Sequence, residues 1–164
     1  MRFLIVSGGE ATDEFVEGVI KRGGYDVILA ADSGMDFLYR TKILPDIIVG
    51  DFDSVDPEVL EFFREHEEID ICALNPVKDD TDTEFAIRES IRRGATEITI
   101  IGGTGTRLDH VLGNISLLGI GLEEDVRMEL LDANNRIRMT DHSVVLKKKQ
   151  QYGKYLSLLP YSEK

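Results

Sequence analysis

Short apolar runs alternate with helix-like segments over the first 132 residues, and this alternation constrains the fold more than any other feature. The runs that predict strands span residues 2–7, 26–31, 47–49, 69–74, 97–101 and 126–131. Between them, apolar side chains at helical spacing predict helices over residues 12–22, 35–41, 57–67, 81–93 and 108–122. Continuous apolar strands joined by helices are typical of a parallel sheet with both faces covered. We therefore expect an α/β fold for residues 1–132, with a mainly parallel sheet between two layers of helices.

The pattern changes after residue 132, where turn signals follow one another closely. The runs 136–140, 143–147 and 154–159 are separated by such signals and predict antiparallel strands. They indicate a second unit over residues 133–164, a small antiparallel β domain. It would hold only three or four strands, so we expect this β domain to be incomplete and the chain truncated.

The charge balance excludes some classes of partner. Among 164 residues, 31 are acidic and 19 basic, which gives a formal net charge of -12. Such a chain is unlike a nucleic-acid-binding protein, which presents a basic face, and it would be repelled by an anionic membrane. Cys72 is the only cysteine, so no internal disulfide can form. A reducing, cytoplasmic location is therefore expected, and no apolar run is long enough to span a membrane.

The first polar cluster with possible chemistry is the acidic pair that follows the third predicted strand. In extended backbone, residues two apart point to the same side, roughly 6.6 Å from each other, so Asp51 and Asp53 can face one point. Two carboxylates this close repel unless a cation lies between them, and Mg²⁺ prefers such hard oxygen ligands. The alternative is a turn, capped by an aspartate, that leads into the next helix.

The second cluster lies at the start of the helix predicted at residues 81–93. It contains Asp79, Asp80, Asp82 and Glu84, and Lys78 lies beside them. Acids favour helix N-termini and Thr81 is a suitable cap, so a purely structural role is possible. The number of mutually repelling carboxylates is better explained by metal ligands or by contacts to hydroxyl groups of a ligand. Lys78 would then either neutralise its neighbours or bind phosphate.

The third cluster is the glycine-rich turn at residues 102–107, before the last predicted helix. Such a turn exposes backbone N–H groups to an anion, and Arg107 adds a bidentate phosphate donor. It matches neither a P-loop nor a dinucleotide fingerprint, and glycine turns are often structural. With Arg107 and Asp109 next to it, phosphate binding is the favoured interpretation. His110 and Asn114 could contact the same ligand or serve the local structure.

The polar clusters all follow predicted strands, at residues 7–10, 32–34, 50–54, 75–83 and 102–110. The carboxyl ends of parallel strands meet at one edge of a sheet, which is where ligands bind in open α/β folds. Asp32 is placed where a ribose or base contact is common. Acids for Mg²⁺ and a glycine turn with an arginine for phosphate together indicate phosphoryl-transfer chemistry.

Four ordered motifs resemble those of the thiamine pyrophosphokinase family: ADSG at 31–34, GDFDS at 50–54, KDDTD at 78–82 and GGTGTRLDH at 102–110. The resemblance implies transfer of the terminal diphosphate of ATP to the hydroxyl of thiamine, giving AMP and thiamine diphosphate. It implies Mg²⁺ at Asp51, Asp53 and Asp82. It also implies a homodimer that holds thiamine between the α/β domain of one subunit and the β domain of the other.

The site expected from the motifs and the resemblance has two groups of residues. Those assigned to catalysis are Asp51, Asp53, Asp79, Asp80, Asp82, Arg107 and Asp109. Those assigned to ATP are Gly9, Asp32, Ser33, Gly34, Lys78, Thr81, Gly103, Thr104, Gly105, Thr106, Arg107, His110 and Asn114. Family members continue beyond the stretch that matches residues 157–160, so we expect incomplete thiamine contacts in this chain.

Two other functions fit part of the pattern. Residues 48–55 resemble the nucleophile strand of haloacid-dehalogenase-like phosphatases, in which Asp51 would be the covalent nucleophile and Mg²⁺ the cofactor. Against this, that motif normally opens the fold, whereas two strand-helix units precede it here. The other alternative is a non-catalytic module that binds nucleotide.

Overall fold

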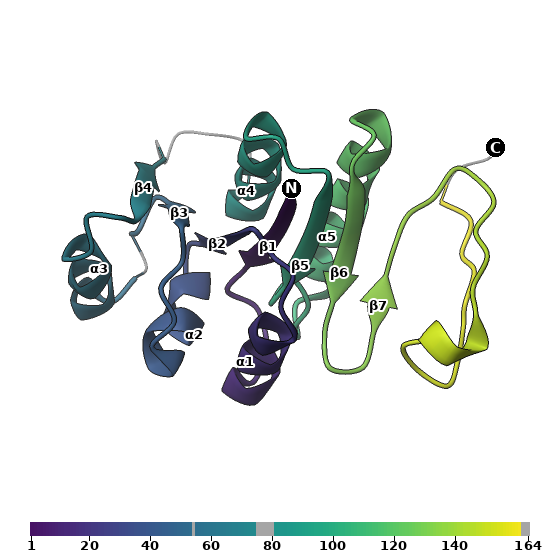
Figure 1. Ribbon diagram of the computed structural model, residues 1–164, viewed down its shortest axis with the longest axis horizontal. Coiled ribbons are helices and arrows are strands. Elements are labelled where there is room, and N and C mark those ends of the chain that lie inside the picture. Colours follow the sequence, from purple (N-terminus) through teal and green to yellow (C-terminus); the bar gives the residue numbers. More distant parts are fainter. Residues whose placement is uncertain (54, 75–80, 162–164) are drawn as a thin grey trace.

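One sheet forms the centre of the protein in the computed structural model, which describes residues 1–53, 55–74 and 81–161 (Figure 1). Its strands are β1 (Arg2–Val6), β2 (Val27–Ala31), β3 (Ile47–Gly50), β4 (Asp70–Ala73), β5 (Glu97–Ile101), β6 (Arg127–Leu131) and β7 (Arg136–Ile137). Their order is β4-β3-β2-β1-β5-β6-β7. The pairs from β4 to β6 are parallel and β7 is antiparallel to β6. The predicted α/β fold with a mainly parallel sheet is confirmed.

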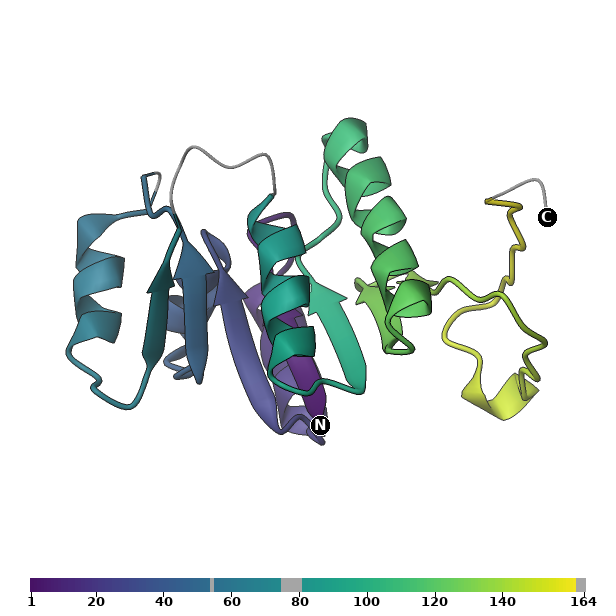
Figure 2. The ribbon, with the colours of Figure 1, turned by 90° about the horizontal axis from the view of Figure 1, so that it is seen from above.

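Helices cover both faces of this sheet, as Figures 1 and 2 show. They are α1 (Asp13–Arg22), α2 (Gly34–Thr41), α3 (Pro57–Arg64), α4 (Asp82–Arg92) and α5 (Leu108–Glu123). The side chains of Thr12, Asp56 and Thr81 cap α1, α3 and α4 by accepting a hydrogen bond from a backbone N–H of the first turn. Among the described residues, no helix combines the length and the apolar character needed to cross a bilayer.

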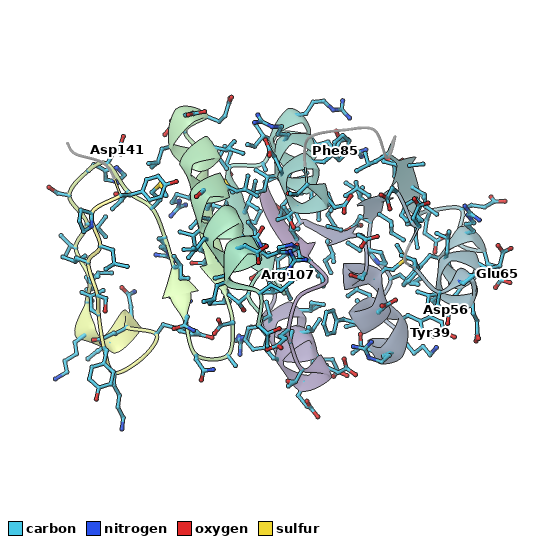
Figure 3. The ribbon with its side chains drawn as sticks, turned by 180° about the vertical axis from the view of Figure 1, so that it is seen from behind. Tyr39, Asp56, Glu65, Phe85, Arg107 and Asp141 are labelled. Carbon is cyan, nitrogen blue, oxygen red and sulfur yellow. The ribbon has the colours of Figure 1, made fainter. Side chains whose placement is uncertain are left out.

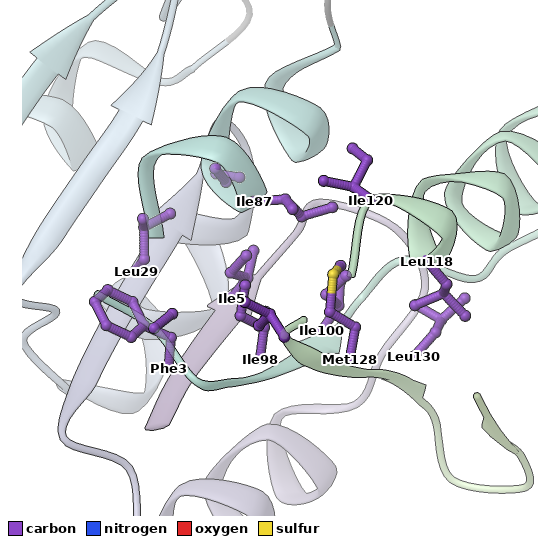
Figure 4. Close-up of a cluster of buried hydrophobic side chains, with 14 of the residues drawn as sticks. Phe3, Ile5, Leu29, Ile87, Ile98, Ile100, Leu118, Ile120, Met128 and Leu130 are labelled. Atoms are coloured by element: carbon purple, nitrogen blue, oxygen red, sulfur yellow. The ribbon is translucent and has the colours of Figure 1, made fainter. Parts of the chain in front are cut away.

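Two apolar layers hold the helices to the sheet. Side chains of α4 and α5, among them Ile87 and Leu118, pack with Phe3, Ile5 and Ile100 of the sheet on one face (Figure 4). On the other face, α1, α2 and α3 pack against the alternate residues of the same strands, such as Leu4 and Val6. Neighbouring residues of a strand point to opposite faces, so a continuous apolar run supplies both layers.

The strand order places β1 in the middle of the sheet. Ile5 of β1 pairs with Leu29 of β2 on one side and with Ile100 of β5 on the other. From β1 the chain builds outward to β4, and then returns to the other side of β1 to form β5 and β6. The strand order thus reverses beside β1, and the α1 and α5 connections leave toward opposite faces.

The strand prediction for residues 136–159 was wrong in part. Of the three expected strands, only Arg136–Ile137 forms, and it extends the parallel sheet rather than opening a second one. The described residues from 138 to 161 contain one short 3₁₀ helix, Lys148–Gln150, and no strand. Val145 and Leu158 are each 86% exposed, because no strand of the described part of the chain pairs with their segments. A run with strand composition stays irregular when nothing completes its hydrogen-bond ladder.

Candidate active site

Loops from the carboxyl ends of β1 and β5 meet where the strand order reverses. The N–H of Gly9 donates to the carbonyl of Gly102 at 2.7 Å, and the N–H of Glu10 donates to the carbonyl of Thr104 at 2.8 Å. In open α/β sheets this reversal point opens the crevice that receives ligands. The glycine turn is therefore placed where a ligand is expected.

Glycines let these loops approach closely. Gly102 has a φ of 67°, and a Cβ there would lie 2.0 Å from the carbonyl oxygen of Ser7. A Cβ on Gly9 would lie 2.4 Å from the carbonyl oxygens of Gly102 and Thr104, and one on Gly34 would lie 1.9 Å from that of Val6. Backbone contact alone thus requires glycine at these positions, while nucleotide binding by Gly9 and Gly34 stays a prediction.

Carboxylates from three elements converge at the same edge. Asp32 follows β2 in the left-handed conformation, with a φ of 46°, Asp51 follows β3, and Asp82 opens α4. Burial raises the pKa of Asp82, and the negative charges of Asp32 and Asp51 raise it further. Asp53 lies beside them, because its N–H donates to Oδ1 of Asp51 at 3.1 Å. The structure therefore brings the sequence-predicted acids Asp32, Asp51 and Asp82 together and gives Asp51 the capping turn named as the alternative.

The donor chemistry of this acidic group fits a divalent cation. Its ligands would be hard carboxylate oxygens, which Mg²⁺ prefers, and a cation would relieve the repulsion that, after burial, raises the pKa of Asp82. Within the described ranges, however, no three His, Cys, Asp or Glu side chains are close enough to enclose an ion as they stand. Asp51, Asp53 and Asp82 are thus candidates whose side chains would have to move closer together.

The predicted phosphate donor lies at the start of α5, where Figure 3 labels it. Arg107 is two-thirds exposed (67%), and its Nη2 donates to Oδ2 of Asp109 at 2.7 Å. This hydrogen bond lowers the pKa of Asp109. His110 is 62% exposed beside them. Arg107 is accessible to an anionic ligand, and Asp109 holds its guanidinium.

Three of the residues predicted to contact ATP make contacts within the fold. Asn114 donates from Nδ2 to the carbonyl of Gly103 at 2.7 Å and so ties α5 to the glycine turn. Thr81 accepts from the N–H of Glu84 as the N-cap of α4, which confirms the predicted cap. Ser33 precedes α2 without a side-chain cap bond and contacts the loop after β1, since a Cβ on Gly8 would lie 1.8 Å from its Oγ.

The remaining predicted site residues lie in the glycine-rich loop, where the carbonyl of Thr104 accepts the N–H of Glu10, or fall in the stretch 75–80. Thr104, Gly105 and Thr106 belong to the loop between β5 and α5. Lys78, Asp79 and Asp80 lie outside the described residues.

A part-buried hydroxyl pair is the main contact that the sequence motifs do not predict. Oγ of Ser7, directly after β1, lies 3.0 Å from Oγ1 of Thr83, the second residue of α4. Ser7 is 4% exposed. Its only sequence signal is its position at the carboxyl end of the first strand, because the two residues are 76 positions apart.

A second feature missed from the sequence is the carboxyl of Asp36 in α2. Its Oδ1 is buried and has no hydrogen-bond partner among the described residues. Burial raises the pKa of Asp36, and the charge of Arg40 partly opposes that rise. Nothing in the surrounding sequence distinguishes this aspartate from an ordinary helix-surface acid.

Comparison with known proteins gives a consistent result. Residues 23–130 match the family model described as "Thiamin pyrophosphokinase, catalytic domain". The chain is 33% identical over 138 residues to thiamine pyrophosphokinase from Bacillus subtilis, covering 82% of this chain and 63% of the relative. It is 34% identical over 85 residues to thiamine pyrophosphokinase 1 from Oryza sativa, covering 48% of this chain and 32% of that one.

Solved structures agree with the sequence matches. A crystal structure of the Bacillus subtilis thiamine pyrophosphokinase superposes with a TM-score of 0.72 at 28% identity, covering 84% of this chain and 64% of that chain. A thiamin pyrophosphokinase family protein from Enterococcus faecalis gives 0.70 at 33% identity, with the same coverage. The chain thus spans slightly less than two thirds of these relatives. These matches support neither the phosphatase nor the non-catalytic alternative.

The converging acids, the glycine turn with Arg107 and the family match over residues 23–130 lead to one conclusion. This chain belongs to the thiamin pyrophosphokinase family.

Proposed function

We propose that the protein is a thiamine pyrophosphokinase, which transfers the terminal diphosphate of ATP to the hydroxyl of thiamine and releases AMP. The observation that carries this proposal is the convergence of Asp32, Asp51 and Asp82 beside the meeting point of the β1 and β5 loops. A triphosphate placed there would have acids for a metal on one side and the glycine turn with Arg107 on the other. The family membership supports the same reaction.

Each group of residues would have a role in the reaction that follows from its chemistry. Asp51, Asp53 and Asp82 would hold Mg²⁺, which when bound neutralises phosphate oxygens as charge develops on them. Arg107 is accessible and can bind a phosphate bidentately, with Asp109 fixing the guanidinium before the ligand arrives. Asn114 ties α5 to the glycine turn, whose N–H groups would bind phosphate. Phosphoryl transfer depends mostly on such positioning and charge compensation.

The remaining parts of the proposal concern the whole molecule. Residues 1–132 would form the catalytic, nucleotide-binding domain, and residues 133–164 would belong to a thiamine-binding β domain. Two copies would form a homodimer with thiamine held between the α/β part of one and the β part of the other. The protein would act in the cytoplasm and would bind neither nucleic acid nor membranes.

The proposal is tested by incubating the protein with ATP, Mg²⁺ and thiamine and by measuring AMP and thiamine diphosphate. We expect Asp51→Asn and Asp53→Asn each to lower the rate at least ~100-fold, because an amide is a poorer magnesium ligand than a carboxylate. Asp125→Asn is the matched control. Asp125 is exposed in the α5–β6 turn with a φ of 54°, which Asn also tolerates, so its rate should not change. Full activity in both Asp51→Asn and Asp53→Asn would refute the metal assignment.

A further inference from the structure

The contact between Ser7 and Thr83 joins two elements that are far apart in the sequence. Ser7 ends the central strand of the sheet, and Thr83 lies in the first turn of α4. Their hydroxyl oxygens are 3.0 Å apart, and Ser7 is 4% exposed. Because Ser7 is buried, removal of the Thr83 hydroxyl would leave the hydroxyl of Ser7 without this partner, which costs free energy.

Ser7 is the fixed side of this contact. Its N–H donates to the carbonyl of Ile101 at 2.8 Å, which continues the β1–β5 ladder. Its carbonyl oxygen is packed against Gly102, where a Cβ would come within 2.0 Å. The backbone of Ser7 is therefore held by β5 and by the glycine turn, so its hydroxyl is a firm anchor for α4.

Thr83 connects the hydroxyl pair to the acidic group of the site. Asp82 directly precedes it, so the two Cα atoms lie about 3.8 Å apart and cannot move independently. Asp32 and Asp51 follow the neighbouring strands β2 and β3 at the edge where Asp82 opens α4, and like charges at this edge disfavour a close approach of Asp82. The N-cap bond from Glu84 to Thr81 lies within the helix and does not oppose this repulsion.

We propose that the Ser7–Thr83 hydroxyl pair is a positioning device that holds the start of α4, and with it Asp82, beside Asp32 and Asp51. Because Ser7 also touches the glycine turn, the pair fixes the position of the acidic group relative to the glycine turn, which would bind phosphate. The two hydroxyls are positioning groups and not catalytic residues. The inference rests on the proposed function only in assuming that this edge binds a magnesium nucleotide.

The test compares four variants. Ser7→Ala and Thr83→Val remove the hydrogen bond with little change of shape, whereas Thr83→Ser keeps the hydroxyl. Ser90→Ala is the matched control, because Ser90 is fully buried in the same helix and, among the described residues, its hydroxyl donates to the carbonyl of Ala86 within that helix. Binding of ADP in the presence of Mg²⁺ is measured by calorimetry, alongside thermal unfolding, kcat and KM for ATP.

We expect Ser7→Ala and Thr83→Val each to lower kcat and to weaken Mg²⁺-dependent ADP binding about tenfold, which corresponds to the loss of one part-buried hydrogen bond. Their double variant should be little worse than either alone, since both remove the same contact. Thr83→Ser, which keeps the hydroxyl, should bind ADP within about twofold of the unchanged protein. Ser90→Ala should leave binding, kcat and KM unchanged.

Two results would overturn the inference. One is unchanged ADP binding and kcat in both Ser7→Ala and Thr83→Val. The other is an equal loss in Ser90→Ala, which would show a general effect of packing. Failure of the proposed function looks different: the unchanged protein would bind ADP with Mg²⁺ and respond to the variants, yet form no thiamine diphosphate. Absence of Mg²⁺-dependent ADP binding in the unchanged protein would overturn both.

Discussion

Glu89 in α4 is a charged side chain that the fold buries, with 7% of the residue exposed. Its carboxylate accepts hydrogen bonds from Arg92 at 2.7 and 2.5 Å and from Arg93 at 2.6 Å, and Arg93 also reaches Asp70 of β4. The hydrogen bonds from Arg92, with those from Arg93, lower the pKa of Glu89 to about 2, although burial opposes this. The network thus ties the last turn of α4 to the edge of the sheet.

This network makes stability depend on pH. The pKa of Glu89 is about 2 in the folded protein against 4.5 for an ordinary glutamate, so its contribution is full above about pH 4.5 and is lost as pH falls toward about 2. We expect Glu89→Gln to lower the free energy of unfolding by on the order of 3 kcal/mol at pH 7. The difference should shrink below pH 4.5, as urea unfolding at several pH values would show.

Glu17→Gln is the control for this effect. Glu17 pairs with Lys21 one helical turn away on the surface of α1, so its replacement should cost only a few tenths of a kcal/mol. An equal loss in the two variants, or a Glu89→Gln loss that persists unchanged at pH 3, would contradict the assignment.

Single residues were predictable from the sequence where the reason for them is local. Thr81 was identified as a cap because its partner lies three residues away, and the structure confirms it. Asp51 and Asp53 are two residues apart, so their shared direction follows from backbone geometry. The pairing of Ser7 with Thr83 depends on how α4 packs on β1, so no local pattern contains it.

At the scale of elements, the connection from β5 to α5 shows how one glycine can fix a loop. Gly102 combines a left-handed φ with a site for Cβ that the carbonyl of Ser7 already occupies. We expect Gly102→Ala to destabilise the protein by more than about 2 kcal/mol, from backbone strain and the steric clash together. Chemical denaturation gives the measurement.

Substitutions at two other glycines allow the effect of backbone strain to be distinguished from that of the steric clash. Gly94 has a φ of 89° but open space around its Cβ position, so Gly94→Ala should cost about 1–2 kcal/mol from strain alone. Gly113 lies inside α5 with open space, so Gly113→Ala should stabilise by about 0.5–1 kcal/mol. A Gly102→Ala loss no larger than that of Gly94→Ala would show that the loop moves to accommodate a methyl group.

Elements were predicted well wherever burial on both faces produces an unbroken apolar run. The runs that form β1 and β5 match their predicted ranges to within one residue. The runs at 143–147 and 154–159 have similar composition but no partner strand in the described residues, and their apolar side chains remain exposed. Composition therefore indicates which segments can form strands, whereas pairing decides which of them do.

At the scale of the whole molecule, the C-terminal segment is distinct from the α/β part. Figures 1 and 2 show it extending beyond β7, away from the helices. It also differs in charge: residues 133–164 contain seven Lys and Arg and two Asp and Glu, although the complete chain has a net charge of -12. A described contact back to the sheet is the hydrogen bond from the Tyr152 hydroxyl to the carbonyl of Asp132, at 2.6 Å.

This separation predicts the result of limited proteolysis. Trypsin should cut first at Lys147, Lys148 or Lys149, which lie exposed in and beside the 3₁₀ helix. The remaining fragment should unfold cooperatively, with a free energy of unfolding within about 0.5 kcal/mol of that of the uncut protein. Mass spectrometry and thermal unfolding would check this. First cuts within α1–α5, or a large loss of stability after the cut, would show that the segment is part of the core.

The central position of β1 also affects synthesis of the protein. Its partner on one side, β2, follows within about one helix, but its partner on the other side arrives much later, since Arg2 pairs with Glu97. On the ribosome, an apolar strand with one open edge must therefore wait for most of the α/β part to be made. Open strand edges invite pairing with other chains, so this interval is when the nascent protein is most exposed to aggregation.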